Sequence, residues 1–514
     1  MSGSSSNILF ITSDQHSHRY LGNRPAHNGG EDVDTPTLDQ LEDNSTSFDS
    51  TYCATPLCTP SRLSLLTGKR APNADAWGNS SLLQPDLETF PETLSNAGYE
   101  TCLIGKMHLG GNRQFAGFDH RPYGDLTGNT GHQMEPPNRS LGEQGPDWEA
   151  LVTDVGNTDI PESLLQERNV IAESMSFLRE HEYANPDQPW ALCASFSRPH
   201  WPRTAPERFF DKYWQGGVSE PRIVEGADTD EHPLIAEQKE LTAGVTHDDA
   251  MRARAAYFAC VEYLDELIGD FLAALDRDGF LDDTIVVYTS DHGEMAGEHG
   301  LWDKCTYHES STRVPLFVQT PEHRTDDLEP SRFERPVNLI DLYPTLCNLV
   351  GVTPPKDLDG TNLSASIVNE EEPERGPVMT DCFATPGAPA TDYRMVRDGD
   401  YKYVRFRDAP ELLFNVEEDP LETENLAEEP RDDDAEALES LRNVVRESLD
   451  FEETLEQKEK AAQLKDEYRL GAYRGGPNQY HLPDGRVIDA DTPIYHPDVV
   501  AEEPDVIFDD FEEP

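Results

Sequence analysis

Two continuous apolar segments, far apart in the chain, each run into an aspartate. Residues 7–13 lead to Asp14, and residues 284–289 lead through a serine to Asp291. Apolar runs without polar alternation are typical of strands that are buried on both faces of a parallel sheet. Such sheets place their ligands just beyond the carboxyl ends of their strands. The sequence therefore predicts an α/β fold with these two carboxylates among its functional groups.

Further strands and helices surround these two segments. Buried strands are predicted over residues 99–104 and 190–196, and the apolar spacing of residues 248–279 predicts a long helix that packs in the core. Residues 112–160 lack periodicity and are expected to form loops over the site, and residues 203–245 are expected to be irregular. Shorter helices are predicted over residues 34–43, 89–98 and 163–182.

The sequence pattern changes near residue 375. Residues 393–397 and 401–406 alternate across Asp398-Gly399-Asp400, as the two arms of a β-hairpin do. A strand at 411–415 and a helix at 433–449 complete this unit. We therefore predict a large domain that carries the site at residues 1–375, a small antiparallel-sheet-plus-helix subdomain at 376–450, and a charged helix with an extended acidic tail at 451–514.

The charge of the chain excludes several classes of partner. Its 514 residues include 100 acidic and 41 basic ones, which gives a net charge of −59. Nucleic acids and anionic membranes would repel such a chain, so neither is an expected partner. Acid spread over the whole length favours a halophilic host whose salt screens the self-repulsion, with an acidic protein of an ordinary host as the alternative. No apolar run reaches the roughly 18 residues of a membrane span, and the first residues do not form a secretory signal, so a cytoplasmic location is expected.

The pentapeptide Cys58-Thr59-Pro60-Ser61-Arg62 combines residues that suit the start of a helix. Thr59 can cap a helix, and Pro60 fits the first helical turn, where a missing N–H has no consequence. Cys58 would then lie at the positive end of the helix dipole, where an anion is favoured. Arg62, one turn further along, can direct its charge toward the same place. The alternative is a buried thiol before an ordinary helix.

This pentapeptide resembles the signature of the type I sulfatases, in the alkaline phosphatase superfamily. In that family the cysteine is oxidised after translation to formylglycine, whose hydrate supplies the nucleophile. The resemblance extends to about residue 450 and implies an alkaline phosphatase-like α/β fold, with a large, mostly parallel sheet flanked by helices. It also implies that a formylglycine-generating enzyme matures Cys58.

The resemblance further implies a site for one divalent metal ion. Asp14, Gln15, Cys58, Asp291 and His292 match the positions of its ligands. Many sulfatases have a second aspartate in place of the glutamine and an asparagine in place of the histidine, and bind calcium. The residues found here resemble those of the choline sulfatase and phosphonate monoester hydrolase branch. Because imidazole is a poor calcium ligand, manganese is favoured, with magnesium and calcium as alternatives.

Three cations match family residues that neutralise the sulfate. Gly105-Lys106-Met107-His108 matches the motif Gly-Lys-x-His, in which Lys106 would bind a sulfate oxygen and His108 would bond to the hydrated aldehyde. Lys304, 13 residues after Asp291, matches a lysine that bridges sulfate and leaving group. Arg62 is expected to add positive charge to the same site.

Two loop residues complete the candidate site. His200, in a Pro-His pair after the strand at 190–196, is the candidate general acid, because histidine can donate a proton near neutral pH. Asn79, at a similar distance from the cysteine as in relatives of this branch, is expected to contact the anion.

Three functions remain open on these residues. The first is a sulfatase that hydrolyses a small sulfated organic substrate. The second is a phosphonate monoester or phosphodiester hydrolase that uses the same site, and the third is a non-enzymatic acidic protein with unmodified Cys58. The tail from Tyr468 has aromatic residues between turns and is expected to lie on a neighbouring subunit, as in a homo-oligomer, or to close the site.

Overall fold

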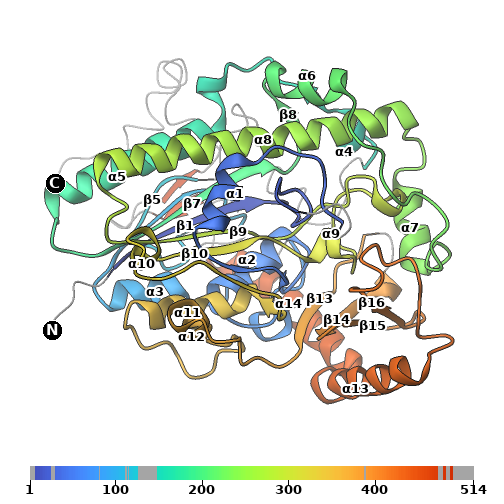
Figure 1. Cartoon of the computed structure of the whole chain (residues 1–514). Helices are drawn as coiled ribbons and strands as arrows, with labels where there is room; N and C mark the ends of the chain where they lie inside the picture. The colour runs from blue at the N-terminus through green and yellow to red at the C-terminus, as the bar shows by residue number, and fades with distance from the viewer. Residues whose placement is uncertain are drawn as a thin grey trace.

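A mixed sheet forms the centre of the fold (Figure 1). The computed structural model describes residues 6–24, 29–79, 81–109, 113, 115–124, 148–386, 389–472, 479–481 and 487–489. Over these residues the sheet has eight strands in the order β11-β2-β10-β9-β1-β7-β4-β5. Their bounds are β1 (Asn7–Asp14), β2 (Thr46–Phe48), β4 (Glu100–Gly105), β5 (His120–Tyr123), β7 (Trp190–Pro199), β9 (Thr284–Ser290), β10 (Leu316–Gln319) and β11 (Ser331–Phe333).

The strand β1 lies between β7 and β9 and runs parallel to both. In the register of these pairs, Ser13 lies opposite Ser290, and Asp14 lies opposite Pro199. The carboxyl ends of the three central strands therefore meet at one edge of the sheet, as the apolar runs predicted. The mostly parallel sheet with flanking helices confirms the predicted alkaline phosphatase-like α/β class.

Helices cover both faces of the sheet because the side chains of β1 alternate between two cores. Ile8 and Phe10 belong to one core, and Leu9 and Ile11 belong to the other. Each such side chain contributes roughly 1.5–3 kcal/mol when fully buried. The first core includes residues of α2 (Cys58–Thr67), α3 (Phe90–Asn96) and α11 (Leu342–Leu349), and the second includes residues of α1 (Pro36–Asp43), α5 (Gln166–Ala184) and α8 (His247–Asp278).

A second, antiparallel sheet lies beside the first, near the carboxyl end of the chain (Figure 1). Its strands are β13 (Val378–Cys382), β14 (Tyr393–Asp398), β15 (Tyr401–Phe406) and β16 (Leu412–Asn415), and α13 (Asp432–Ser448) packs on it. The predicted hairpin is present as β14 and β15, which turn at Gly399 with φ 53°. We call β13–β16, the loop to residue 431 and α13 the C-terminal unit. The predicted domain boundaries at 375 and 450 stay predictions.

Further elements connect these layers or follow the C-terminal unit, and all of them except the 22-residue α14 are short. They are β3 (Thr51–Tyr52), α4 (Ala150–Thr153), β6 (Gly156–Asn157), β8 (Thr204–Ala205), α9 (Glu309–Thr312), α10 (Pro321–Arg324), β12 (Val337–Asn338), α12 (Ser364–Asn369), α14 (Phe451–Ala472), β17 (Gln479–His481) and β18 (Val487–Asp489). Across the part of the chain that the structure describes, no helix combines the length and the apolar character that a bilayer crossing requires.

One prediction is wrong, and two others fall partly outside the described residues. Residues 203–245 are not irregular, because they form α6 (Glu207–Gly216) and α7 (Pro233–Leu241). Aromatic residues of α6 at helical spacing are buried against α8. The many acidic residues elsewhere in 203–245 made this helical pattern hard to recognise in the sequence. Residues 112–160 were expected to form loops; about half of them are not described, and the described part contains β5, α4 and β6. Most of the tail after 472 is not described.

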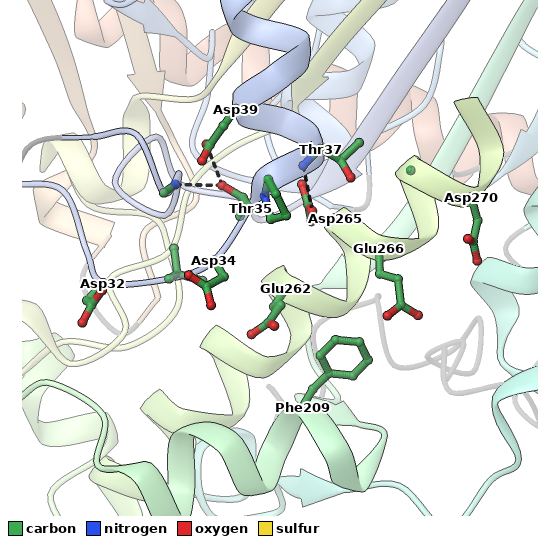
Figure 2. Close-up of a pocket in the computed structure, with 14 residues that line it drawn as sticks. Asp32, Asp34, Thr35, Thr37, Asp39, Phe209, Glu262, Asp265, Glu266 and Asp270 are labelled. Atoms are coloured by element: carbon green, nitrogen blue, oxygen red, sulfur yellow. Dashed lines mark hydrogen bonds between the residues drawn. The ribbon is translucent and has the colours of Figure 1, made fainter. Parts of the chain in front are cut away.

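A surface cavity of about 620 Å³ lies between α1 and α8. Figure 2 shows that acidic side chains surround it. Asp265 accepts hydrogen bonds from the N–H groups of Thr37 and Leu38 at the start of α1, and burial raises the pKa of Asp265 to about 6. None of the candidate site residues lines this cavity. It belongs to the acidic surface of the chain and is separate from the candidate site residues.

Candidate active site

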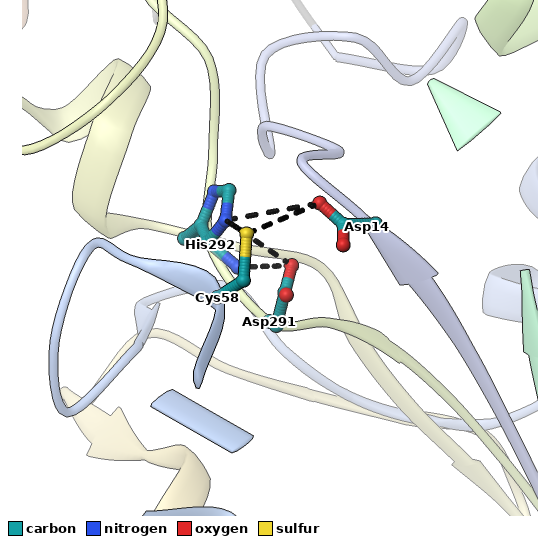
Figure 3. A group of neighbouring side chains, drawn as sticks. All are labelled: Asp14, Cys58, Asp291 and His292. Carbon is teal, nitrogen blue, oxygen red and sulfur yellow. Dashed lines mark hydrogen bonds and ion pairs between the residues drawn. The ribbon is translucent and has the colours of Figure 1, made fainter. Parts of the chain in front are cut away.

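Four predicted metal ligands lie together at the carboxyl edge of the central sheet (Figure 3). Asp14 ends β1, Cys58 begins α2, and Asp291 and His292 follow β9. One ligand atom from each lies within 4.8 Å of the others, and all four residues are buried. The Cys58 Sγ atom is 3.2 Å from His292 Nε2 and 3.8 Å from Asp14 Oδ1. Two carboxylates and an imidazole suit a divalent cation that accepts oxygen and nitrogen ligands.

Backbone hydrogen bonds fix the orientation of these ligands. His292 Nδ1 donates to the Gly293 carbonyl oxygen at 3.0 Å, which turns Nε2 toward the cluster. Asp291 Oδ1 accepts from the N–H groups of Gln15 and His292 at 3.1 and 2.9 Å. A second bond that holds the ring of a ligating histidine is a usual feature of metal sites. The residues present therefore fit a divalent metal ion held by Asp14, Asp291, His292 and the side chain of residue 58.

Arg62 lies in this cluster, but its donors are used by protein groups. Nε donates to Asp291 Oδ2 at 2.8 Å, and Nη2 pairs with Asp14 Oδ2 at 3.2 Å. Nη1 donates to the Lys106 carbonyl oxygen and to Ser195 Oγ. The guanidinium thus holds the two carboxylates at a fixed separation. That Arg62 also adds positive charge toward a bound sulfate stays a prediction.

Two buried lysines give the cluster its positive charge. Lys304 Nζ lies 3.2 Å from Cys58 Sγ, and Lys106 pairs with Asp14. Burial would raise the pKa of the Cys58 thiol, but Lys304, Lys106 and His292 outweigh it and hold the pKa well below its usual value. These cations favour the thiolate form of the side chain. The surroundings of residue 58 stabilise a negative charge on its side chain, as a nucleophile at this position requires.

The predicted histidines both reach Cys58. The side chains of His108 and His200 hydrogen-bond to it. The backbone N–H of His200 also donates to the Asp14 carbonyl oxygen at 3.1 Å. Burial, Lys106 and Lys304 lower the pKa of His200, so its ring is neutral at pH 7. This protonation state makes His200 a poor general acid, and the assignment of that role to it stays a prediction.

The helix that carries Cys58 begins differently from the prediction. Its first residue is Cys58 itself, and Leu57 is the N-cap, with no hydrogen bond from its side chain. Thr59 is not the cap, because its hydroxyl donates to the His108 carbonyl oxygen at 2.7 Å. Asn79 Oδ1 instead accepts from the Thr59 N–H at 3.1 Å. A loop residue twenty positions away thus performs the capping, which local sequence cannot indicate.

Gln15 is oriented toward Lys304. Its Oε1 accepts from Lys304 Nζ at 2.7 Å, and its Nε2 donates to Asp303 Oδ1 at 2.8 Å and to Glu294. Its φ of 71° is unusual for a residue other than glycine and is typical of strained functional positions. The role of Gln15 as a metal ligand stays a prediction.

The sequence interpretation missed a group of carboxylates behind Lys304. The buried Glu294 and the half-buried Asp303 accept from Gln15, and Arg203 Nη2 pairs with Glu294 at 2.6 Å. Against the effect of burial, Asp303 and Cys58 raise the pKa of Lys304, which keeps it charged. Glu294 comes two residues after His292, and this position next to the Asp-His-Gly motif could have identified it in the sequence.

Gly105 should not tolerate a side chain. A Cβ there would lie 2.0 Å from the Ser195 carbonyl oxygen, and its φ of 94° strains any other residue. Gly105→Ala is therefore expected to lower the free energy of unfolding by about 2–4 kcal/mol and to displace Lys106. Denaturant unfolding and kcat/KM would measure both effects. Gly216→Ala, at a helical position with open space around it, is the control, and equal behaviour of the two variants would contradict the prediction.

Comparisons with known proteins agree with this geometry. The sulfatase family model matches residues 6–352, and a model described as N-sulphoglucosamine sulphohydrolase, C-terminal, matches residues 297–448. The choline-sulfatase of Rhizobium meliloti is 32% identical over 439 residues, which cover 83% of this chain and 83% of that protein. The arylsulfatase of Clostridium perfringens is 28% identical over 468 residues, which cover 87% of this chain and 95% of that protein.

Solved structures share the fold. The phosphonate monoester hydrolase of Silicibacter pomeroyi superposes with a TM-score of 0.71 at 23% identity, covering 87% of this chain and 96% of that one. A protein solved with its substrate D-glucosamine-2-N,6-O-disulfate gives a TM-score of 0.67 at 23% identity, covering 89% and 98%. The family match and the 32% identical relative confirm the resemblance, and the chain belongs to the sulfatase family.

Proposed function

We propose that the protein is a sulfuric ester hydrolase that cleaves the sulfate monoester of a small organic alcohol, with residue 58 matured to formylglycine. The observation that carries this proposal is the position of Cys58. Its side chain lies against three metal-ligand candidates and 3.2 Å from the lysine Lys304. Sulfate esters are anions that resist an anionic nucleophile, and this set of cations offsets that repulsion.

The residues of the chain have separable tasks in this reaction. As a hydrated aldehyde, residue 58 would offer one hydroxyl to attack sulfur and a second whose deprotonation releases sulfate. A divalent cation held by Asp14, Asp291 and His292 would polarise the sulfate and lower the pKa of the attacking hydroxyl. Lys304, which stays charged, can donate a proton to the departing alkoxide. His108 is placed to accept the proton of the second hydroxyl.

Several finer assignments belong to this proposal. We propose manganese as the metal, because of the imidazole of His292, and a formylglycine-generating enzyme as the maturation partner. A halophilic, cytoplasmic setting would follow from the net charge of −59. The choline-sulfatase similarity makes choline sulfate one member of the substrate panel. We further propose that the tail from Tyr468 lies on a neighbouring copy of the chain in a homo-oligomer.

A phosphonate monoester or phosphodiester hydrolase is the second candidate. It is favoured by Gln15 and His292 and by the similarity to a phosphonate monoester hydrolase fold. Steady-state kinetics on matched aryl esters of sulfate, phosphonate and phosphodiester, at high potassium chloride, would distinguish the two. We expect kcat/KM for the sulfate to exceed the others at least about tenfold, or ~1.4 kcal/mol of transition-state binding. A larger value for either phosphorus ester would overturn the proposal.

A further inference from the structure

A buried charged cluster joins the C-terminal unit to the catalytic domain. Lys402, on β15, has a fully buried side chain that pairs with Glu309 Oε1 at 2.9 Å and with Glu422. Both carboxylates are buried, and Glu422 Oε2 accepts from the Glu309 N–H at 2.7 Å. We call these three residues the Lys402 cluster. Burying a lysine and two carboxylates is unfavourable unless each is well paired, so their arrangement is tightly constrained.

One path leads from this cluster to His292. Glu309 is the first residue of the short helix α9. The N–H groups of Gly293 and Glu294 donate to the carbonyl oxygens of Ser311 and Ser310, each at 2.8 Å. A Cβ on Gly293 would lie 2.0 Å from the Ser310 carbonyl oxygen, so the two backbones are in direct contact. The backbone after His292 therefore rests on the helix that Glu309 begins.

A second path leads from the same carboxylate toward Cys58. The Tyr52 hydroxyl donates to both carboxylate oxygens of Glu309 at 3.0 Å, and Arg397 Nε donates to the Tyr52 hydroxyl at 3.1 Å. The Cys53 N–H then donates to the Thr312 carbonyl oxygen at 2.9 Å. Residues 52 and 53 open the loop that ends at Cys58. Glu309 thus connects to two of the three segments that supply the candidate site, those that carry His292 and Cys58.

We propose that Lys402 and Glu422 of the C-terminal unit are positioning residues of the sulfatase centre. They act through their shared partner Glu309, which holds the backbone segments that carry His292 and Cys58. Neither residue touches the catalytic cluster, so their effect is on geometry and not on the chemical step itself. A displacement of about 1 Å at a catalytic group can lower a rate a hundredfold. The inference rests on the proposed function.

The charge of the cluster changes near neutral pH. Burial and Glu309 raise the pKa of Glu422 from 4.5 to about 7, although Lys402 opposes this. The folded protein therefore holds this proton more tightly than the unfolded chain does. The stabilising contribution is present below pH 4.5 and is lost as the pH rises toward 7 and above. Charged and titratable groups that face the cluster include Arg397 on β14, Arg313 after α9, His18 after β1, Tyr52 on β3, and Tyr307 and His308 before α9.

The test compares variants of the full-length, manganese-loaded enzyme with measured formylglycine content. For Glu422→Gln, which cannot ionise, we expect the ratio of its kcat to that of the wild type to rise at least about threefold between pH 6 and 8.5. For Lys402→Met we expect kcat to fall about tenfold or more while KM stays within about twofold, with partial recovery in Lys402→Arg. Arg442→Met is the matched control, because Arg442 pairs with Glu411 inside the same unit and should keep wild-type kcat.

Two results would overturn the inference. A ratio that is constant with pH, or a Lys402→Met variant with wild-type kcat, would show that the cluster does not position the site. If the wild-type enzyme hydrolyses no sulfate ester, the proposed function fails. The positioning role of Lys402 is then tested separately, by Mn²⁺ binding measured with calorimetry. We expect Lys402→Met to bind Mn²⁺ at least about tenfold more weakly than Arg442→Met, and equal affinities would contradict the proposal. Because Glu422→Gln preserves size and buries no new charge, it covers the case in which Lys402→Met does not fold.

Discussion

Cys58→Ala should lower turnover of a sulfate ester at least about a thousandfold, because it removes the group from which the nucleophile is made. The fold should survive the change. Lys304 keeps its hydrogen bond to Gln15, and Lys106 keeps its pair with Asp14, so neither lysine is left without a partner. Thermal unfolding of the two proteins should therefore nearly coincide while kcat is lost.

Cys58→Ser separates the two halves of the mechanism. A serine hydroxyl can attack sulfur once, but it has no second hydroxyl through which sulfate could leave. We expect one equivalent of alcohol to be released and a stable sulfated serine to be detected by peptide mass. Turnover by Cys58→Ala at the wild-type rate would end the proposed mechanism. An intact Cys58 thiol in active protein from its native host would contradict the formylglycine assignment. The unmodified side chain of Cys58 would then have to act as the nucleophile.

Local sequence was sufficient for the features that one strand or one helix can carry. The apolar runs before Asp14 and Asp291 identified two strands of the parallel sheet, and the structure shows that these strands are neighbours. The hairpin at Gly399 followed from alternation and turn chemistry alone. The α6 helix was missed because its apolar stripe is short, with only Phe209, Phe210 and Tyr213 buried, and because the segment that follows it is acidic and rich in turn residues. In a helix of ten residues with three buried side chains, the apolar periodicity is too short to stand out in the sequence.

The partners of buried charges could not be predicted in the same way. Arg62 was expected to add positive charge to the site, and the protein groups that occupy its donors, Asp14, Asp291 and two others, were not predicted. Asn79 was expected to contact the anion, and in the structure its side-chain oxygen accepts from the backbone of Thr59. Each of these bonds joins distant segments, and such pairings depend on the packed fold. Residue type and spacing predict which residues belong to a site, but they do not predict which of these residues bond to one another.

Removing the metal is expected to abolish activity, and His292 should decide which ion restores it. After chelation we expect Mn²⁺ to restore kcat more fully than Ca²⁺, because an imidazole nitrogen suits manganese better than calcium. His292→Ala should weaken Mn²⁺ binding at least about a hundredfold, since loss of even an outer partner of a metal ligand has effects of roughly 10- to 100-fold. Calorimetry and elemental analysis of the purified protein would measure these changes.

The variant His292→Asn provides the sharper comparison. It exchanges the nitrogen donor for an amide oxygen, and we expect it to shift the preference from Mn²⁺ toward Ca²⁺ without loss of the fold. His247→Ala, at an exposed position on α8, is the control and should bind metal as the wild type does. Stoichiometric calcium in the native enzyme, with equal Mn²⁺ affinity in His292→Ala, would remove His292 from the ligand set. The remaining oxygen donors and residue 58 would then have to hold the ion, and the argument for manganese would fail with the histidine.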